Sequence, residues 1–288
     1  MNMKSDTDLK SGICVTVGET DSYIYLSGIK PDRVVALDNN VILMPISCSP
    51  VPDDMIDAVM KHGNRSEFEL GVLIATLRLT SAQIKVQEDN ARSLVISTWN
   101  AQTTCILLAA LLNCEIAWYC QANDSADHFS AQTRISFVYP NMYKFPATTK
   151  IIDDKTCLWI EKSLSSALTL SEDERFLNAA NALWSYRWNP RPSVQLSVIW
   201  GGIESLFLLE RKIKQNLSMA ASRFLKGNDD MVGDIKHLYN ARCKAVHEAK
   251  NNTNEALLAS SELLHNLILQ CVKLNSLPDW KELLNTKD

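Results

Sequence analysis

Arg242 and His247 are the residues of this sequence best placed for chemistry, and they share one predicted helix, from Asp229 to about Lys250. Four apolar residues at helical spacing define the inward stripe of this helix: Met231, Ile235, Leu238 and Ala245. Arg242 falls on that stripe. A guanidinium directed into a core or an interface is costly unless it is paired, because it does not lose its proton. A structural Arg242 therefore needs a buried carboxylate, whereas a functional one faces a ligand or a second subunit.

Glu204 is the carboxylate that best fits as the partner of Arg242. It lies in an apolar helix predicted from Ser193 to about Lys214, within the segment Trp200-Gly201-Gly202-Ile203-Glu204-Ser205-Leu206-Phe207. A carboxylate with such neighbours is expected to have a cationic partner. We therefore predict an ion pair between Glu204 and Arg242, and we expect the paired glycines beside it to permit close helix packing.

Two segments carry a resemblance to a known family. Leu238-Tyr239-Asn240-Ala241-Arg242-Cys243-Lys244-Ala245-Val246-His247 resembles the R-x(4–6)-H signature of the HEPN superfamily. Upstream, Ile199 to Phe207 is similar to the preceding helix of the Apea-like branch, in which a Leu/Ile-Glu pair is followed by apolar residues. The resemblance extends over roughly the last 110 to 135 residues, and an α+β N-terminal region is common in that branch.

The resemblance implies a metal-independent endoribonuclease that needs no cofactor, an effector or toxin of prokaryotic defence or stress response. His247 would then act as general acid or base on the ribose 2′-hydroxyl and the leaving oxygen, and Arg242 would hold the scissile phosphate. Cleavage through the 2′-hydroxyl would leave a cyclic phosphate and spare DNA. The remaining residues assigned to the site are these: Glu204, Cys243, Lys244 and Glu248 as supporting residues, and Lys236, His237 and Tyr239 as RNA contacts.

Helix geometry limits how the two motif residues act together. Five positions correspond to about 140° of rotation and roughly 7.5 Å of rise, and an Arg side chain leans toward the helix N-terminus, away from His247. Either the helix ends near His247 or a second protomer completes the site. We predict a homodimer, with RNA and a regulatory protein as further partners.

Two residues of the motif depart from the family pattern and favour a second hypothesis. Cys243 stands where many active relatives have a small polar residue, and Glu248 stands where Apea-like sequences commonly have Gly. Glu248 also brings negative charge to a site for phosphate. The second hypothesis is a catalytically inactive HEPN module that serves as a platform for dimerisation, RNA binding or partner binding, with the N-terminal domain as sensor.

The charge distribution sets the motif region apart from the rest of the chain. Between Ser205 and Lys250 there are nine Lys or Arg against five Asp or Glu, a net of +4, whereas the remainder has 20 against 28, a net of −8. A basic segment on an acidic protein fits a localised phosphate-binding surface. Solvated helix faces explain the same lysines equally well, so both interpretations stay open.

Composition and cysteine spacing predict a soluble cytoplasmic protein. The apolar share is 46 %, and the N-terminal residues 1–12 lack the apolar run of a signal peptide. The longest apolar stretch, Cys105 to Cys120, is interrupted by Asn113 and Glu115 and is too short to span a bilayer. The eight cysteines are scattered without C-x-x-C or metal-ligand spacing, so we predict reduced, buried thiols and no metal site.

The predicted fold class is α+β, with an N-terminal mixed α/β domain at 1–150 and an all-α, HEPN-like bundle at 151–288. Strands are predicted at 13–17, 23–26, 33–37, 41–44, 94–98 and 115–120, from β-branched and aromatic runs. Helices are predicted at 53–62 and 100–112, and the run at 68–80 stays unassigned. In the second domain, Ser171 and Glu174 predict a capping box for a helix to about Trp188, and a last helix runs from Thr253 to about Asn275.

Overall fold

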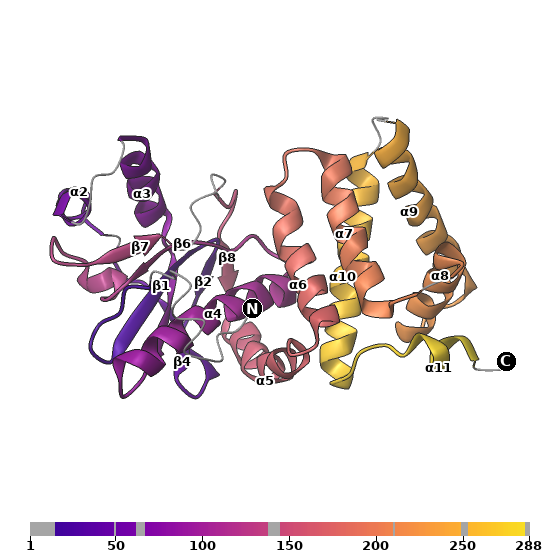
Figure 1. Ribbon diagram of the computed structural model, residues 1–288, viewed down its shortest axis with the longest axis horizontal. Coiled ribbons are helices and arrows are strands. Elements are labelled where there is room, and N and C mark those ends of the chain that lie inside the picture. Colours follow the sequence, from indigo (N-terminus) through magenta and orange to yellow (C-terminus); the bar gives the residue numbers. More distant parts are fainter. Residues whose placement is uncertain are drawn as a thin grey trace. The chain divides into compact units, whose positions relative to one another are not determined.

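The computed structural model describes residues 15–48, 50–61, 67–137, 145–209, 211–248 and 253–285. The described strands lie in the first part of the chain, interleaved with α2, α3 and α4, and only helices follow; the main sheet is antiparallel, as the α+β class requires (Figure 1). Two compact units are present, one formed by 1–108 with 114–162 and the other by 109–113 with 163–288. The division falls inside helix α5 (Asp154–Leu170), later in the chain than the boundary at 150 that the sequence suggested.

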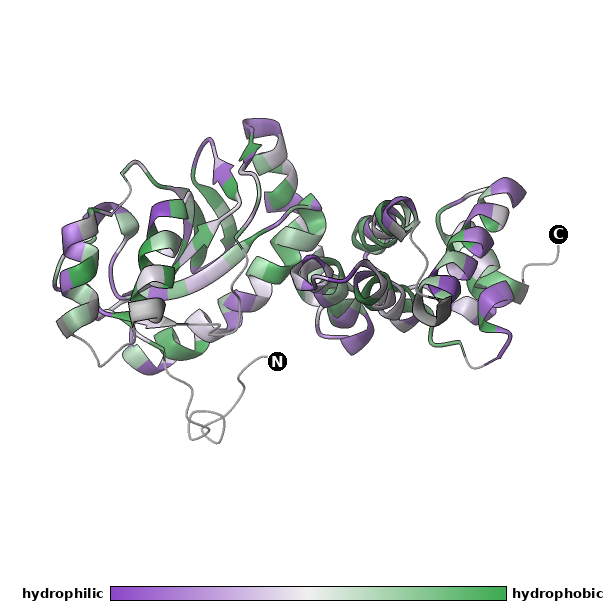
Figure 2. Ribbon diagram, turned by 90° about the horizontal axis from the view of Figure 1, so that it is seen from above, coloured by the Kyte–Doolittle hydropathy of each residue, from purple (hydrophilic) through white to green (hydrophobic). Residues whose placement is uncertain are grey.

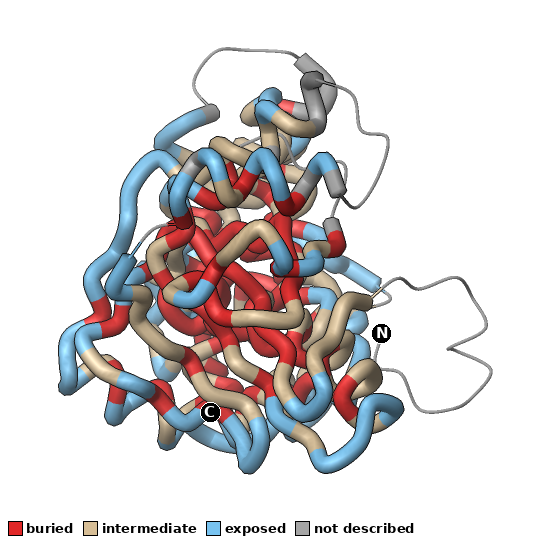
Figure 3. The backbone as a smooth tube through the Cα atoms, turned by 90° about the vertical axis from the view of Figure 1, so that its left-hand side faces the viewer, coloured by how far each residue is buried: buried red, intermediate tan, exposed pale blue. Residues whose placement is uncertain are grey.

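The first unit is built around a six-stranded sheet with the order β3-β4-β5-β1-β6-β7. Its strands are β1 (Asp21–Ser27), β3 (Val35–Asp38), β4 (Val41–Pro45), β5 (Ala82–Gln87), β6 (Ala117–Ala122) and β7 (Ile135–Phe137). β1 and β6 are buried on both faces in the core of this unit, where most of the buried residues are apolar and Ser22, Ser27 and Gln121 are buried polar exceptions (Figures 2 and 3). A separate parallel pair joins β2 (Ile29–Pro31) to β8 (Lys150–Ile152).

The strands expected at 23–26, 33–37, 41–44 and 115–120 are confirmed by β1, β3, β4 and β6. The strand expected at 13–17 is wrong over its described part, 15–17, and its first two residues lie outside the described residues. The unassigned run at 68–80 is helix α3 (Glu67–Leu79), which packs on β1 and β6, and α2 (Pro52–Lys61) matches the predicted helix.

Helix α4 (Ala91–Leu112) replaces the strand that the sequence predicted at Leu94–Thr98. Asn90 starts the helix early, because its side chain accepts a hydrogen bond from the backbone amide of Ser93 at 2.9 Å. The buried residues of α4 then follow helical spacing, and include Leu94, Ala101, Cys105 and Leu108. α4 is long and apolar enough to cross a membrane by length and composition, but 67 % of its apolar window is buried, as in a core helix.

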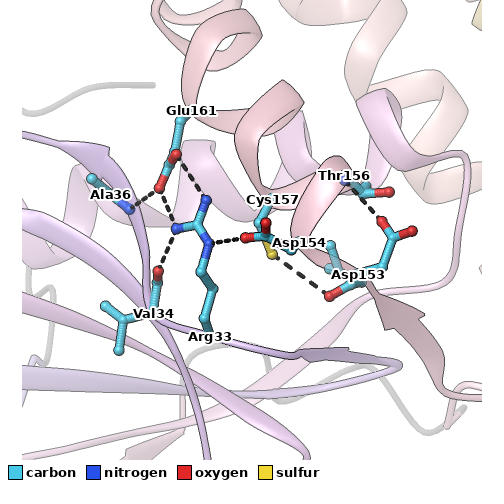
Figure 4. Close-up of polar contacts among 9 residues, drawn as sticks. Arg33, Val34, Ala36, Asp153, Asp154, Thr156, Cys157 and Glu161 are labelled. Atoms are coloured by element: carbon cyan, nitrogen blue, oxygen red, sulfur yellow. Dashed lines mark hydrogen bonds and ion pairs between the residues drawn. The ribbon is translucent and has the colours of Figure 1, made fainter.

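A cluster of ion pairs fastens the beginning of α5 to the edge of β3 (Figure 4). The Arg33 guanidinium donates to both carboxylate oxygens of Glu161, at 2.7 and 3.1 Å, and its Nε donates to Asp154 at 2.6 Å. The backbone amide of Ala36 also donates to Glu161, at 3.3 Å. The Arg33 hydrogen bonds lower the pKa of the Glu161 carboxyl below its ordinary value, and the Ala36 amide lowers it further.

We expect Glu161→Gln to loosen this attachment at neutral pH. Since folding lowers the pKa of Glu161, its contribution to stability is present above the ordinary carboxyl value of 4.5 and is lost as the pH falls below it. Hydrogen exchange at the amides of β3 and early α5 should therefore be faster in the variant at pH 7, and the difference from wild type should shrink below the ordinary carboxyl pKa. A difference that persists unchanged in acid would contradict the ion-pair explanation.

The second unit is helical. After the end of α5 come α6 (Glu174–Ser185), α7 (Pro192–Phe207), α8 (Ile213–Phe224), α9 (Asp229–Glu248), α10 (Thr253–Leu274) and the short α11 (Trp280–Asn285). The predicted capping box is wrong, because Ser171 donates to Leu168 O at the end of α5, and Asp173 is the residue that caps α6. The helix expected from Ser193 to about Lys214 is also shorter, because the left-handed backbone of Leu208, with φ 47°, ends α7.

Gly202 allows α7 to pack closely against α6 and α10. A Cβ atom at this position would lie 2.6 Å from the Cβ of Ala182 and 3.1 Å from a methyl group of Leu264, whereas a Cβ at Gly201 would meet nothing within 4 Å. The expected role in close packing therefore belongs to Gly202, while Gly201 is exposed.

The neighbouring glycines give a matched pair of substitutions. Gly201→Ala should stabilise the second unit by about 0.5–1 kcal/mol, because alanine costs less entropy in a helix. Gly202→Ala gains the same entropic stabilisation, but its methyl group overpacks the contact with Ala182, and this costs about 1–3 kcal/mol. Thermal unfolding followed by circular dichroism should show a higher midpoint for the first variant and a lower one for the second. A higher midpoint for both would mean that the α6–α7 contact is not tight.

Candidate functional site

Helix α9 carries the motif and places Arg242 on its inward side. Asp229 and Asp230 lie in the first turn, where acidic side chains interact favourably with the helix dipole. Asn228 caps the helix, because its side chain accepts a hydrogen bond from the Met231 amide. Of the four residues of the predicted stripe, Ile235 and Ala245 are buried, while Met231 and Leu238 are partly exposed. The helix packs on α7, α8 and α10. Arg242 thus enters the bundle side of α9 rather than its solvent side.

The predicted pairing of Arg242 with Glu204 is present. Nη2 of Arg242 lies 3.9 Å from Oε1 of Glu204, and the two side chains are 27 % and 31 % exposed. This separation is at the long end for an ion pair, so solvent and salt screen it and its contribution to stability is small. Nε of Arg242 is buried and has no hydrogen-bond partner among the described residues. The guanidinium is therefore neutralised but not saturated with acceptors.

An aromatic platform lies beneath this ion pair. The guanidinium carbon of Arg242 sits 5.7 Å from the centre of the Tyr239 ring, and Tyr239 meets the buried Trp200 ring edge-on at 5.2 Å. Trp200 is fixed in turn by a 3.1 Å hydrogen bond from its indole nitrogen to Ser260 Oγ in α10. Burial raises the pKa of the Tyr239 hydroxyl, as does the Glu204 carboxylate, while Arg242 lowers it. The ring stacking and the ion pair together draw the guanidinium toward the N-terminal end of α9.

The site residues predicted from the sequence fall into separate groups. Glu204, Arg242 and Tyr239 come together, as described above. Lys236 lines a depression with Lys212 and Lys214 instead. His237 and Lys244 are exposed, and Cys243 is partly exposed.

His247 and Glu248 are the last two residues of α9 that the structure describes, and their side chains lie outside the described part of the chain.

Two features near the motif had signals in the sequence that the motif itself does not include. Trp200 precedes Glu204 by one helical turn, so the two occupy one face of α7, and both reach α9. Lys212 and Lys214 belong to the basic segment, but only the beginning of α8 brings them to Lys236. Both features depend on contacts between helices, α7 with α9 and α8 with α9.

Among the residues that the structure describes, no group of three or more His, Cys, Asp or Glu side chains is arranged to hold a metal ion. The described cysteines are free thiols, and burial raises the pKa of Cys271 to about 12. The chain matches no known protein family, and neither curated proteins nor solved structures show a significant match to it.

The Arg242–Glu204 pair should couple weakly. In a double-mutant cycle with Arg242→Gln and Glu204→Gln, we expect an interaction energy below about 1 kcal/mol, because the charges are 3.9 Å apart and about 30 % exposed. The free energy of opening of the α9 amides is measured by hydrogen exchange in four proteins: the wild type, the two single variants and the double variant. A coupling of several kcal/mol would instead indicate a desolvated structural pair.

Proposed function

We propose that the helical unit is a HEPN-type, metal-independent endoribonuclease of the Apea-like kind. One observation carries the proposal: a permanently charged guanidinium, Arg242, stands on the inward side of α9, is 27 % exposed, and has one long carboxylate contact among the described residues. An arginine held in this way retains donors for a phosphate, which a short, bidentate structural pair would not leave. The R-x(4)-H motif and the Glu204-bearing helix supply the rest of the argument.

In the proposed reaction Arg242 binds the scissile phosphate and stabilises the negative charge that grows on it. His247 transfers the proton of the ribose 2′-hydroxyl or of the leaving oxygen, a role that suits a side chain titrating near neutrality. Glu204 and Tyr239 act as positioning residues, because they contact Arg242 and hold it against α7. They keep a flexible side chain oriented before the phosphate arrives.

The spacing on α9 favours a site completed by two protomers. Arg242 leans toward the N-terminal end of the helix, over Tyr239, while His247 lies five residues later, roughly 7.5 Å further along the axis. Two copies of α9 that meet head to tail would bring the arginine of one protomer to the histidine of the other. We therefore propose a homodimer as the active form, in a defence or stress-response effector whose first unit senses the trigger or a regulatory partner.

A catalytically inactive RNA-binding or partner-binding platform is the second candidate. The observation that favours it is the engagement of Arg242 within its own protomer, by Glu204 and Tyr239. Cys243 and the acidic Glu248 point the same way. In this case the same residues stabilise α9 and perform no chemistry.

Cleavage of RNA in the presence of EDTA distinguishes these candidates. Wild-type protein should cut single-stranded RNA, and His247→Ala and Arg242→Ala should each slow cleavage by about a hundredfold or more, because each removes a proton-transfer or charge-stabilising group. The matched controls are His128→Ala and Arg191→Ala, exposed residues remote from the motif in sequence. Equal cleavage by all five proteins would assign the activity to a contaminant or another site, and no cleavage by any would favour the platform.

A further inference from the structure

A basic depression lies where the beginning of α8 meets the middle of α9. Its volume is about 520 Å³, and the described residues that line it are Lys212, Ile213, Lys214, Gln215 and Lys236. Three of these five carry positive charge and none is acidic, although the whole chain has a net charge of −4. Like charges gathered around one hollow repel each other, and a bound anion relieves that repulsion.

The first turn of α8 adds to the positive potential of the depression. Lys212 occupies the N-cap position with a left-handed backbone, φ 48°, and its side chain makes no capping hydrogen bond. The first backbone bond of the helix runs from Asn216 N to Lys212 O, so the amides of Ile213, Lys214 and Gln215 precede it. Amides in this position favour negative charge, and here three lysines stand around them.

One face of α9 connects the depression with the motif histidine. Lys236, Asn240, Cys243 and His247 follow at spacings of four, three and four residues, which places them on one side of a helix that is continuous over this range. Asn240 is exposed and Cys243 is partly exposed, so a ligand can lie along this face. Eleven positions correspond to roughly 16 Å along the axis, a distance that a strand of several nucleotides spans.

We propose that the Lys212–Lys214–Lys236 depression binds backbone phosphates of an RNA strand at a distance from the cut, and that the strand follows the Asn240 and Cys243 face of α9 to His247. The part of this proposal that concerns the position of the cut rests on the proposed nuclease function. The binding of phosphates in the depression does not depend on that function. Lysine ammonium groups bind phosphate as point charges and contact no base edge, so the depression sets affinity and strand path rather than sequence preference. Substrates too short to reach it bind poorly.

The test measures binding apart from cleavage. Full-length protein with His247→Ala, which removes turnover, is titrated against a labelled single-stranded RNA in EDTA over a range of KCl concentrations, by fluorescence anisotropy. In that background Lys212, Lys214 and Lys236 are changed together to Gln. The matched control changes Lys155, Lys162 and Lys273 to Gln, three exposed lysines that do not line the depression, with the same change in net charge. Circular dichroism verifies that all variants fold alike.

The depression variant should bind at least about tenfold more weakly, and its slope of log affinity against log salt should be smaller by about 2, since each lost phosphate contact removes about 0.7. The control should keep the slope of its parent. A single-stranded DNA of the same sequence should show the same loss, because the phosphates are shared. A loss of equal size in depression and control variants, or no loss in either, would overturn the proposal.

Two further arms separate the alternatives. A dinucleotide should bind weakly and equally to parent and depression variant; a dinucleotide that binds as well as the long strand would contradict the strand path. Pyrophosphate that binds more tightly than RNA would assign the depression to a free anion and overturn the proposal. If wild-type protein fails to cut RNA while the salt slope still depends on the three lysines, the nuclease function fails and the phosphate site stands.

Discussion

The position of Arg242 on the inward side of α9 constrains the residues of α7 and α10 that surround it. A guanidinium on the inward side of α9 keeps its charge at any physiological pH, so the bundle must provide compensation where it would otherwise place apolar groups. Glu204 provides a carboxylate at 3.9 Å, Tyr239 provides a ring face, and Trp200 secures that ring with help from Ser260. Three helices, α7, α9 and α10, contribute to holding one cation. Among the described residues, the guanidinium thus has one carboxylate contact and one ring contact.

The distribution of the other charges follows from the same arrangement. α9 turns Arg242 toward α7, and its neighbouring face carries Lys236 to the beginning of α8. One helix therefore serves the ion pair on one side and the basic depression on the other. In the first unit, the ion pairs of Arg33 with Glu161 and Asp154 attach β3 to the first turns of α5.

Residues that contradict their apolar surroundings were predictable from the sequence, whereas helix boundaries and the meeting of α8 with α9 were not. The interrupted stripe identified Arg242 and its pairing with Glu204, because each residue contradicts its apolar surroundings. Leu94–Thr98 was wrongly predicted as a strand, since β-branched composition is a local signal, whereas the Asn90 cap and long-range burial decide the helix. The break between α7 and α8 was missed because Leu208 and Lys212 adopt left-handed backbones without glycine. The lysine depression needs α8 and α9 to meet, which periodicity does not reveal.

The chemical nature of the RNA ends tests the central claim most directly. Mass spectrometry of the fragments formed by wild-type protein in EDTA, beside His247→Ala, reports which atom attacks the phosphate. If Arg242 and His247 catalyse attack by the 2′-hydroxyl, wild type yields fragments with a cyclic 2′,3′-phosphate, His247→Ala yields almost none, and a DNA strand of the same sequence stays intact. Fragments with 5′-phosphate and 3′-hydroxyl ends, or equal cutting of DNA, would contradict the account.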